Sequence, residues 1–117
     1  MSPALFAGIR VRDLAAAAAW YQRLLGAPAF SPNAVEVVWT VAEDRFVYIE
    51  EDPARAGSGL ITVFVDDLDA VLAEIGSRDL EPAEVETYSN GVRKATFRDD
   101  DGNEVGFGGN AGGASPP

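Results

Sequence analysis

The sequence has VRDL at Val11–Leu14 and VDDL at Val65–Leu68, 54 residues further along the chain. In both places an apolar run typical of a strand comes first, and an aspartate suited to a helix N-cap follows. A helical pattern containing leucine and alanine comes next. A repeat of this size indicates two copies of one supersecondary unit. We therefore expect a fold built from two similar modules.

The first half predicts a strand over 5–11, then a helix over 14–25 that ends at Gly26. Strand-like runs follow this helix at 35–41 and 46–50. The second half predicts a strand over 60–65, then a helix that begins after Asp67 and ends at Gly76. Three strands follow at 85–88, 92–98 and 104–107. We interpret both halves as strand, helix and three strands, although only two strand-like runs follow the helix in the first half.

The composition excludes several kinds of partner and site. Nine basic residues against 19 acidic ones give a net charge of −10, which argues against nucleic acid and anionic membranes as partners. The chain has no cysteine and no histidine, so any metal site would need oxygen ligands alone. No apolar run approaches the roughly 18 residues of a membrane span. The cytoplasm is the expected location.

The acidic stretch RDDDGNEVGFGG, Arg98 to Gly109, invites a functional interpretation. An EF-hand calcium loop with Gly102 at its sixth position would need oxygen ligands where Phe97 and Gly108 stand, so that match fails. Consecutive aspartates have diverging side chains, which makes them a poor acid/base pair. We interpret the stretch as an Asp-Gly hairpin turn whose other aspartates are solvated.

Three segments together resemble the glyoxalase/bleomycin-resistance/dioxygenase superfamily, also called vicinal oxygen chelate proteins. They are IRVRDLAAAAAWYQRLLG, VFVDDLDAVLAEI and FRDDDGNEVGF, and the resemblance covers about residues 4–108. It implies an α+β fold of two tandem βαβββ modules, whose curved mixed sheets surround a cavity completed in a homodimer. One domain over 1–108 is expected, with modules at 4–51 and 59–108 and a linker at 52–58. By composition, 109–117 is a disordered tail.

Metal-dependent enzymes of this superfamily place ligands in the first and last strands of each module. The resemblance maps these ligand positions onto Phe6, Leu60 and Gly106, with Glu50 as the one possible donor in the last strand of the first module. One carboxylate does not hold a divalent ion. We therefore predict no metal and no cofactor, and an apolar cavity instead.

Strand alternation places Phe6, Gly8 and Arg10 on one face, and Leu60, Thr62 and Phe64 on another. The resemblance implies that both faces line the cavity. Trp39 and Tyr48 are further candidates, with cavity and core both open for Trp39. Charged candidates are Glu50, Arg10 and Arg93. The predicted ligand-binding set is Phe6, Gly8, Arg10, Trp39, Tyr48, Glu50, Leu60, Thr62, Phe64, Arg93 and Gly106.

Aromatic walls with few polar groups suit a flat, largely apolar small molecule. The leading hypothesis is a metal-independent protein that sequesters an aromatic natural product, as the antibiotic-resistance proteins of the superfamily do. The alternative is a metal-free isomerase, lyase or cyclase with Glu50 as general base. A third interpretation is an accessory domain with a vestigial cavity.

Overall fold

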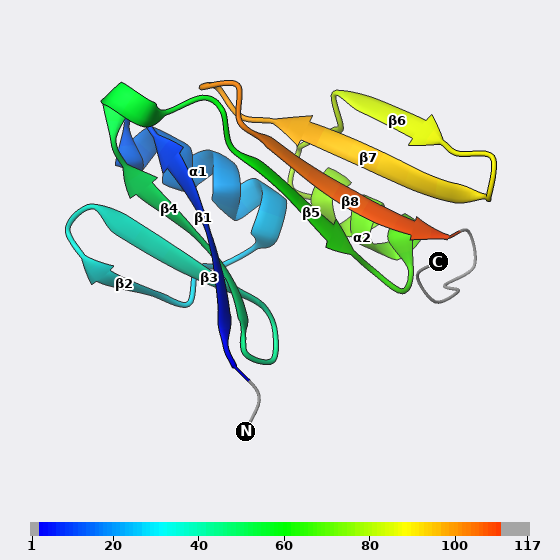
Figure 1. Ribbon diagram of the computed structural model, residues 1–117, viewed down its shortest axis with the longest axis horizontal. Helices are drawn as coiled ribbons and strands as arrows, with labels where there is room; N and C mark the ends of the chain where they lie inside the picture. Colours follow the sequence, from blue (N-terminus) through cyan, green and yellow to red (C-terminus); the bar gives the residue numbers. More distant parts are fainter. Residues whose placement is uncertain (1–2, 111–117) are drawn as a thin grey trace. The chain divides into compact units, whose positions relative to one another are not determined.

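The computed structural model describes residues 3–110 (Figure 1). These residues divide into two compact units, one made of 3–59 with 99–103 and the other of 60–98 with 104–110. The two βαβββ modules expected from the repeat are confirmed, one in each unit. Residues 111–117 of the predicted tail lie outside the described residues. Within residues 3–110, no helix has the length and apolar character needed to cross a membrane.

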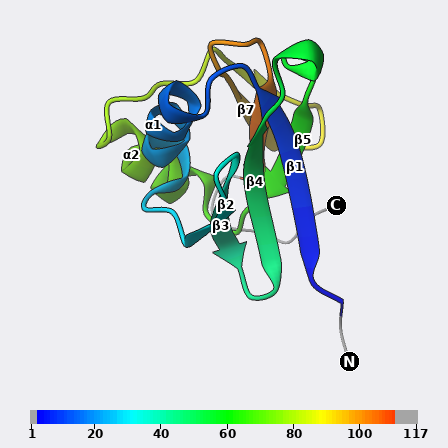
Figure 2. The same ribbon diagram turned by 90° about the vertical axis from the view of Figure 1, so that its left-hand side faces the viewer.

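The first unit contains a four-stranded mixed sheet and one α-helix (Figures 1 and 2). The sheet order is β1-β4-β3-β2; β1 pairs parallel with β4, and the other pairs are antiparallel. The elements are β1 (Leu5–Val11), α1 (Leu14–Leu25), β2 (Phe30–Asn33), β3 (Glu36–Ala42), β4 (Arg45–Glu51) and the short 3₁₀ helix η1 (Pro53–Arg55).

Helix α1 begins and ends where the local sequence predicts. The Asp13 carboxylate accepts a hydrogen bond from the backbone N–H of Ala16 at 3.0 Å, which caps the first turn. Gly26 adopts φ 87°, a conformation that favours glycine, and ends the helix. One side of α1 packs on the sheet through Tyr21 and Leu24, which are both buried.

The two faces of the first sheet differ in what covers them. Ile9, Val47 and Ile49 alternate with their neighbours along β1 and β4, and they lie buried under α1. The opposite side, which we call the helix-free face of the first unit, carries the intervening side chains. These are Phe6, Gly8, Arg10, Val38, Phe46, Tyr48 and Glu50.

The second unit repeats this plan with the sheet order β5-β8-β7-β6 and β5 parallel to β8. Its elements are β5 (Leu60–Phe64), α2 (Leu68–Gly76), β6 (Glu84–Thr87), β7 (Val92–Arg98) and β8 (Glu104–Asn110). Asp67 caps α2 by accepting from the N–H of Ala70 at 3.1 Å. Phe97 and Phe107 form an edge-to-face pair, 6.0 Å apart, in the core.

The presence of strand β2 and the end of strand β8 differ from the sequence prediction. Strand β2 is not marked in the sequence because its four residues are exposed and include Ser31 and Pro32, so they show no apolar alternation. Strand β8 continues to Asn110, whereas the composition predicts that 109 and 110 belong to the tail. Gly109 pairs with Arg93 in β7, which explains how a residue without a side chain stays in the sheet.

The aspartate turn is also different from its prediction, because Asp99 is not solvated. Its carboxylate is buried, with 8% of the residue exposed, and accepts hydrogen bonds from four groups. These are the Tyr21 hydroxyl at 2.8 Å, the N–H groups of Asp101 and Asn103 at 2.9 Å, and the Asn103 amide at 2.8 Å. The turn therefore contributes Asp99 to a buried hydrogen-bond network of the first unit, and it is not only a solvated link between two strands.

We expect Tyr21→Phe to destabilise the protein by about 2 kcal/mol near neutral pH, because it removes a buried hydrogen bond to a carboxylate. Burial, reinforced by the Asp99 carboxylate, raises the pKa of Tyr21 above its ordinary value of 10.0. Above about pH 10 the unfolded chain therefore loses the tyrosine proton while the folded protein keeps it, and the wild type loses stability. Urea unfolding at a series of alkaline pH values should show the two proteins converging. A constant difference would contradict this account.

Candidate functional site

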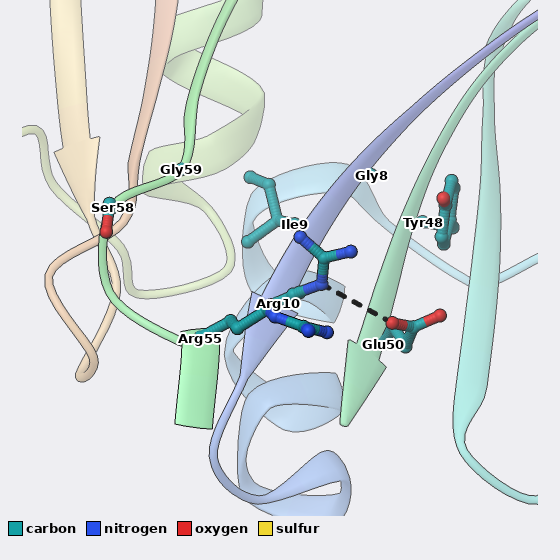
Figure 3. A pocket seen from close by; sticks show the side chains of 8 residues that line it. All are labelled: Gly8, Ile9, Arg10, Tyr48, Glu50, Arg55, Ser58 and Gly59. Atoms are coloured by element: carbon teal, nitrogen blue, oxygen red, sulfur yellow. Dashed lines mark ion pairs between the residues drawn. The ribbon is translucent and has the colours of Figure 1, made fainter. Parts of the chain in front are cut away.

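A pocket of about 350 Å³ opens on the first unit beside β1 and β4 (Figure 3). We call it the charged pocket because Arg10, Glu50 and Arg55 border it. Its full lining is Gly8, Ile9, Arg10, Tyr48, Glu50, Arg55, Ser58 and Gly59. Four of the predicted ligand-binding residues thus meet here: Gly8, Arg10, Tyr48 and Glu50.

The parallel pairing of β1 with β4 places Arg10 directly beside Glu50. Arg10 Nε lies 3.6 Å from Glu50 Oε2 and 3.4 Å from Asp52 Oδ2, while Arg55 Nη1 lies 3.2 Å from the same Asp52 oxygen. The Arg10 side chain is 51% exposed, so these ion pairs contribute at most about 1 kcal/mol each. The charges can therefore exchange partners when a polar molecule enters.

A second hollow of about 390 Å³, the apolar groove, lies on the helix-free face of the same unit. Phe6, Phe30, Pro32, Glu36, Val38 and Tyr48 line it. Phe6 stacks on Phe46 with ring centroids 4.4 Å apart, yet half of Phe6 is exposed. Tyr48 belongs to both hollows, so the apolar groove and the charged pocket adjoin at its ring.

The position of Tyr48 depends on the glycine beside it. A Cβ at Gly8 would lie 2.5 Å from Tyr48 Cζ and 2.6 Å from its hydroxyl oxygen. The ring therefore occupies space that any larger residue at position 8 would take. Gly8 contributes to the site through the room that it leaves, because it has no side chain of its own.

Four further predicted residues, Leu60, Thr62, Phe64 and Gly106, lie in the second unit, on the sheet face that α2 does not cover. Leu60, Thr62 and Phe64 alternate along β5, and the register pairs Thr62 with Gly106 of β8. Leu60 is 66% exposed. We call this surface, completed by Lys94 and Thr96 of β7, the helix-free face of the second unit.

Two predicted ligand contacts need correction. Trp39 is 1% exposed, its indole N–H donates to the Gly26 carbonyl at 2.8 Å, and its ring lies near Tyr21, so it is a core residue under α1. Arg93 alternates away from the helix-free face of the second unit and pairs with Asp69 on α2 at 2.6 Å. Both residues are on the helix side of their sheets.

Several residues that border the two hollows are not predicted from the sequence. Val38 and Glu36 lie on the same face as Tyr48 and Glu50, so alternation alone identifies them once the face is known. Arg55 and Ser58 fall in the predicted linker, and Gly59 begins the predicted second module. They reach the charged pocket because the Asn103 side-chain oxygen accepts hydrogen bonds from the N–H groups at 57 and 59, and no local sequence signal predicts this contact.

The positions that the resemblance maps to metal ligands do not fit a divalent cation. Phe6 and Leu60 have no donor atoms, and Lys94 lies over Gly106, so a positive charge stands near that position. Glu50 faces Arg10. Within residues 3–110, no cluster of three or more acidic, histidine or cysteine side chains has a spacing suited to a metal ion. A single carboxylate beside an arginine does not supply the oxygen ligands that a hard cation requires.

Comparison with known proteins identifies the class. Residues 4–107 match the family model of the Glyoxalase/Bleomycin resistance protein/Dioxygenase superfamily. A solved glyoxalase/bleomycin resistance protein from Catenulispora acidiphila DSM 44928 is 51% identical, with a TM-score of 0.88 and coverage of 92% of this chain and 98% of that one. The chain therefore belongs to this superfamily. No match is found among curated proteins.

Two more distant structures share the fold at 20% identity. A bleomycin-binding protein complexed with bleomycin has a TM-score of 0.73 and covers 93% of this chain and 99% of its own. A lactoylglutathione lyase from Agrobacterium tumefaciens has a TM-score of 0.71, with coverages of 93% and 94%. One is a binding protein and the other is an enzyme, so the fold alone does not select a function.

Proposed function

We propose that this protein is a cytoplasmic, metal-independent binding protein that sequesters an aromatic or largely apolar natural product, in the manner of a drug-binding resistance protein. The observation that carries the proposal is the apolar groove with its exposed aromatic residues. Phe6 is 51% and Phe30 48% exposed, although both are large apolar side chains. Exposed apolar residues that gather in one hollow indicate a binding surface.

The physical gain from filling this groove is large enough for useful affinity. Covering about 100 Å² of aromatic surface contributes about 2.5 kcal/mol, and a flat ring on Phe6 or Tyr48 adds a stacking contribution. Phe6 is already stacked on Phe46, so little side-chain freedom remains to be lost when a ligand binds. A rigid aromatic body is the ligand that profits most from such a surface.

The charged pocket would orient the polar end of the same ligand. It adjoins the groove at Tyr48 and carries the guanidinium groups of Arg10 and Arg55 together with the Glu50 carboxylate. Partly solvated ion pairs are weak, so a ligand group can replace one partner at low cost. A structurally similar protein binds bleomycin, which supports a binding role for this fold.

We expect Phe6→Ala and Tyr48→Ala each to weaken the binding of a planar aromatic antibiotic about tenfold, because each removes one aromatic wall of the groove. Isothermal titration calorimetry over a panel of such antibiotics is the appropriate measurement. Tryptophan emission is a poor reporter, since Trp39 is buried under α1 and Trp20 lies on α1, outside the groove. Val41→Ala is the matched control because Val41 is an exposed apolar residue of β3 outside the groove. Absence of binding heat across the panel would contradict the proposal.

A metal-free enzyme is the second candidate, and one observation favours it. The Glu50 carboxylate borders the charged pocket beside Arg10 and Tyr48, so a base and a group that stabilises negative charge lie together. A carboxylate in that position can remove a proton from a bound molecule while the guanidinium stabilises the enolate that forms. The reaction classes that fit are isomerisation, elimination and cyclisation.

If this second candidate holds, Glu50→Gln abolishes turnover and leaves ligand affinity within a factor of about three, since glutamine keeps the shape but cannot accept the proton. Proton NMR of the incubated ligand measures conversion, and calorimetry measures affinity. Glu43→Gln serves as the control, because Glu43 is an exposed glutamate outside both hollows. A ligand that the wild type binds and leaves unchanged would exclude this candidate.

We also propose that two copies of the chain associate. Leu5 and Leu60 are 63% and 66% exposed, and each begins an edge strand of its sheet. Exposed apolar edges are usually covered in native proteins, and a second copy is the commonest partner.

Sedimentation velocity should therefore give twice the mass of one chain. Leu60→Glu should raise the fraction of single chains, because it places a charge in the covered surface, whereas Val41→Glu should not. A wild-type protein that sediments as a single chain at micromolar concentration would refute this part of the proposal.

A further inference from the structure

Lys94 is the only lysine of the 117-residue chain, and its side chain has an unusual position. It extends from β7 across the helix-free face of the second unit and lies over Gly106 of β8. A Cβ at Gly106 would be 2.5 Å from Lys94 Cε and 3.5 Å from Nζ. The missing side chain of Gly106 therefore provides the space in which the lysine lies.

The ammonium group has no carboxylate partner among residues 3–110. Both arginines of β7 are paired: Arg93 with Asp69, and Arg98 with Glu104 at 2.7 Å and Glu84 at 3.1 Å. The residue opposite Lys94 in β6 is Glu86. Lys94 extends toward β8, on the other side of β7, so it turns away from its cross-strand acid.

The surroundings of Lys94 form a small polar floor with apolar neighbours. The register places Thr62, Gly106 and Thr96 in one row across β5, β8 and β7. Phe64 lies next along β5, where its ring is 3.4 Å from the position of a Cβ at Gly108. An ammonium that lies over a row with two threonines, on a face that also carries an aromatic residue, is suited to an acidic oxygen on an aromatic molecule.

We propose that the helix-free face of the second unit is a binding site of its own, where the Lys94 ammonium binds an acidic oxygen, a carboxylate or a phenolate, of an aromatic acid. The inference goes beyond the proposed function, whose groove and pocket lie in the first unit. The resemblance maps a metal-binding glutamate onto Gly106, and in this protein the Lys94 side chain lies over that position. Because the net charge of −10 repels anions at long range, an acid on this face would have to be held by the local contact with Lys94.

Calorimetry with two matched probes tests this inference: anthraquinone-2-carboxylate and the neutral anthraquinone-2-carboxamide. The wild type should bind the carboxylate about tenfold more tightly, because a charge-assisted hydrogen bond replaces a neutral one. Lys94→Met should bring the two affinities together, and Lys94→Arg should restore part of the difference. Arg45→Met removes the same charge from exposed Arg45 on β4 and should keep the wild-type preference.

A second measurement needs no variant. Reductive methylation with ¹³C-formaldehyde labels one lysine, so NMR shows a single side-chain amine signal, and the N-terminal amine is the internal control. The carboxylate should shift the Lys94 signal and leave the control unchanged. Equal affinity for the two probes, or an unshifted Lys94 signal under saturating carboxylate, overturns this inference alone. Failure of the wild type to bind either probe overturns it as well.

Discussion

The buried side-chain amide of Asn103 joins three separate stretches of the first unit. Its nitrogen donates to the Arg10 carbonyl at 2.9 Å and to Asp99, and its oxygen accepts from the N–H groups of Gly57 and Gly59. An amide left unpaired inside a protein costs about 1–3 kcal/mol, so these contacts are hard to break singly. The loop after η1 is held beside the end of β1 for this reason, and the charged pocket lies between them.

The same unit combines a rigid side and an adaptable side. Under α1, Trp39, Tyr21 and Asp99 are buried and have their polar atoms paired. On the helix-free face, Arg10 and Glu50 are partly solvated and weakly paired. Preorganised apolar walls combined with exchangeable charges are what a protein needs to hold a rigid ligand and still select its polar groups.

The sequence predicts those parts of the fold that depend on neighbouring residues. Asp13 and Asp67 cap helices through contacts three residues away, so local patterns are enough to locate both modules of the repeat. Strand alternation predicts which residues share a face, but not which face lies toward the helix. It places Lys94 and Arg93 on opposite faces of β7, and it does not show which of them lies toward α2. For the same reason the sequence leaves cavity and core both open for Trp39.

Long-range polar contacts account for the buried aspartate and the pocket wall that the sequence does not predict. Asp99 stands among three aspartates that look equivalent in the sequence, and its contact with Tyr21, 78 residues away, is one that no local pattern reveals. The wall of the charged pocket depends on Asn103 in the same way, since 44 residues separate it from Gly59. Local patterns carry no information about such pairs, which arise when distant segments meet.

The contact between Lys94 and Gly106 couples two positions on neighbouring strands. A side chain at position 106 and the present conformation of Lys94 exclude each other, because both would occupy the same space. Any residue larger than glycine at position 106 therefore requires a different conformation of the side chain at position 94, so a substitution at one position changes what the other can contact.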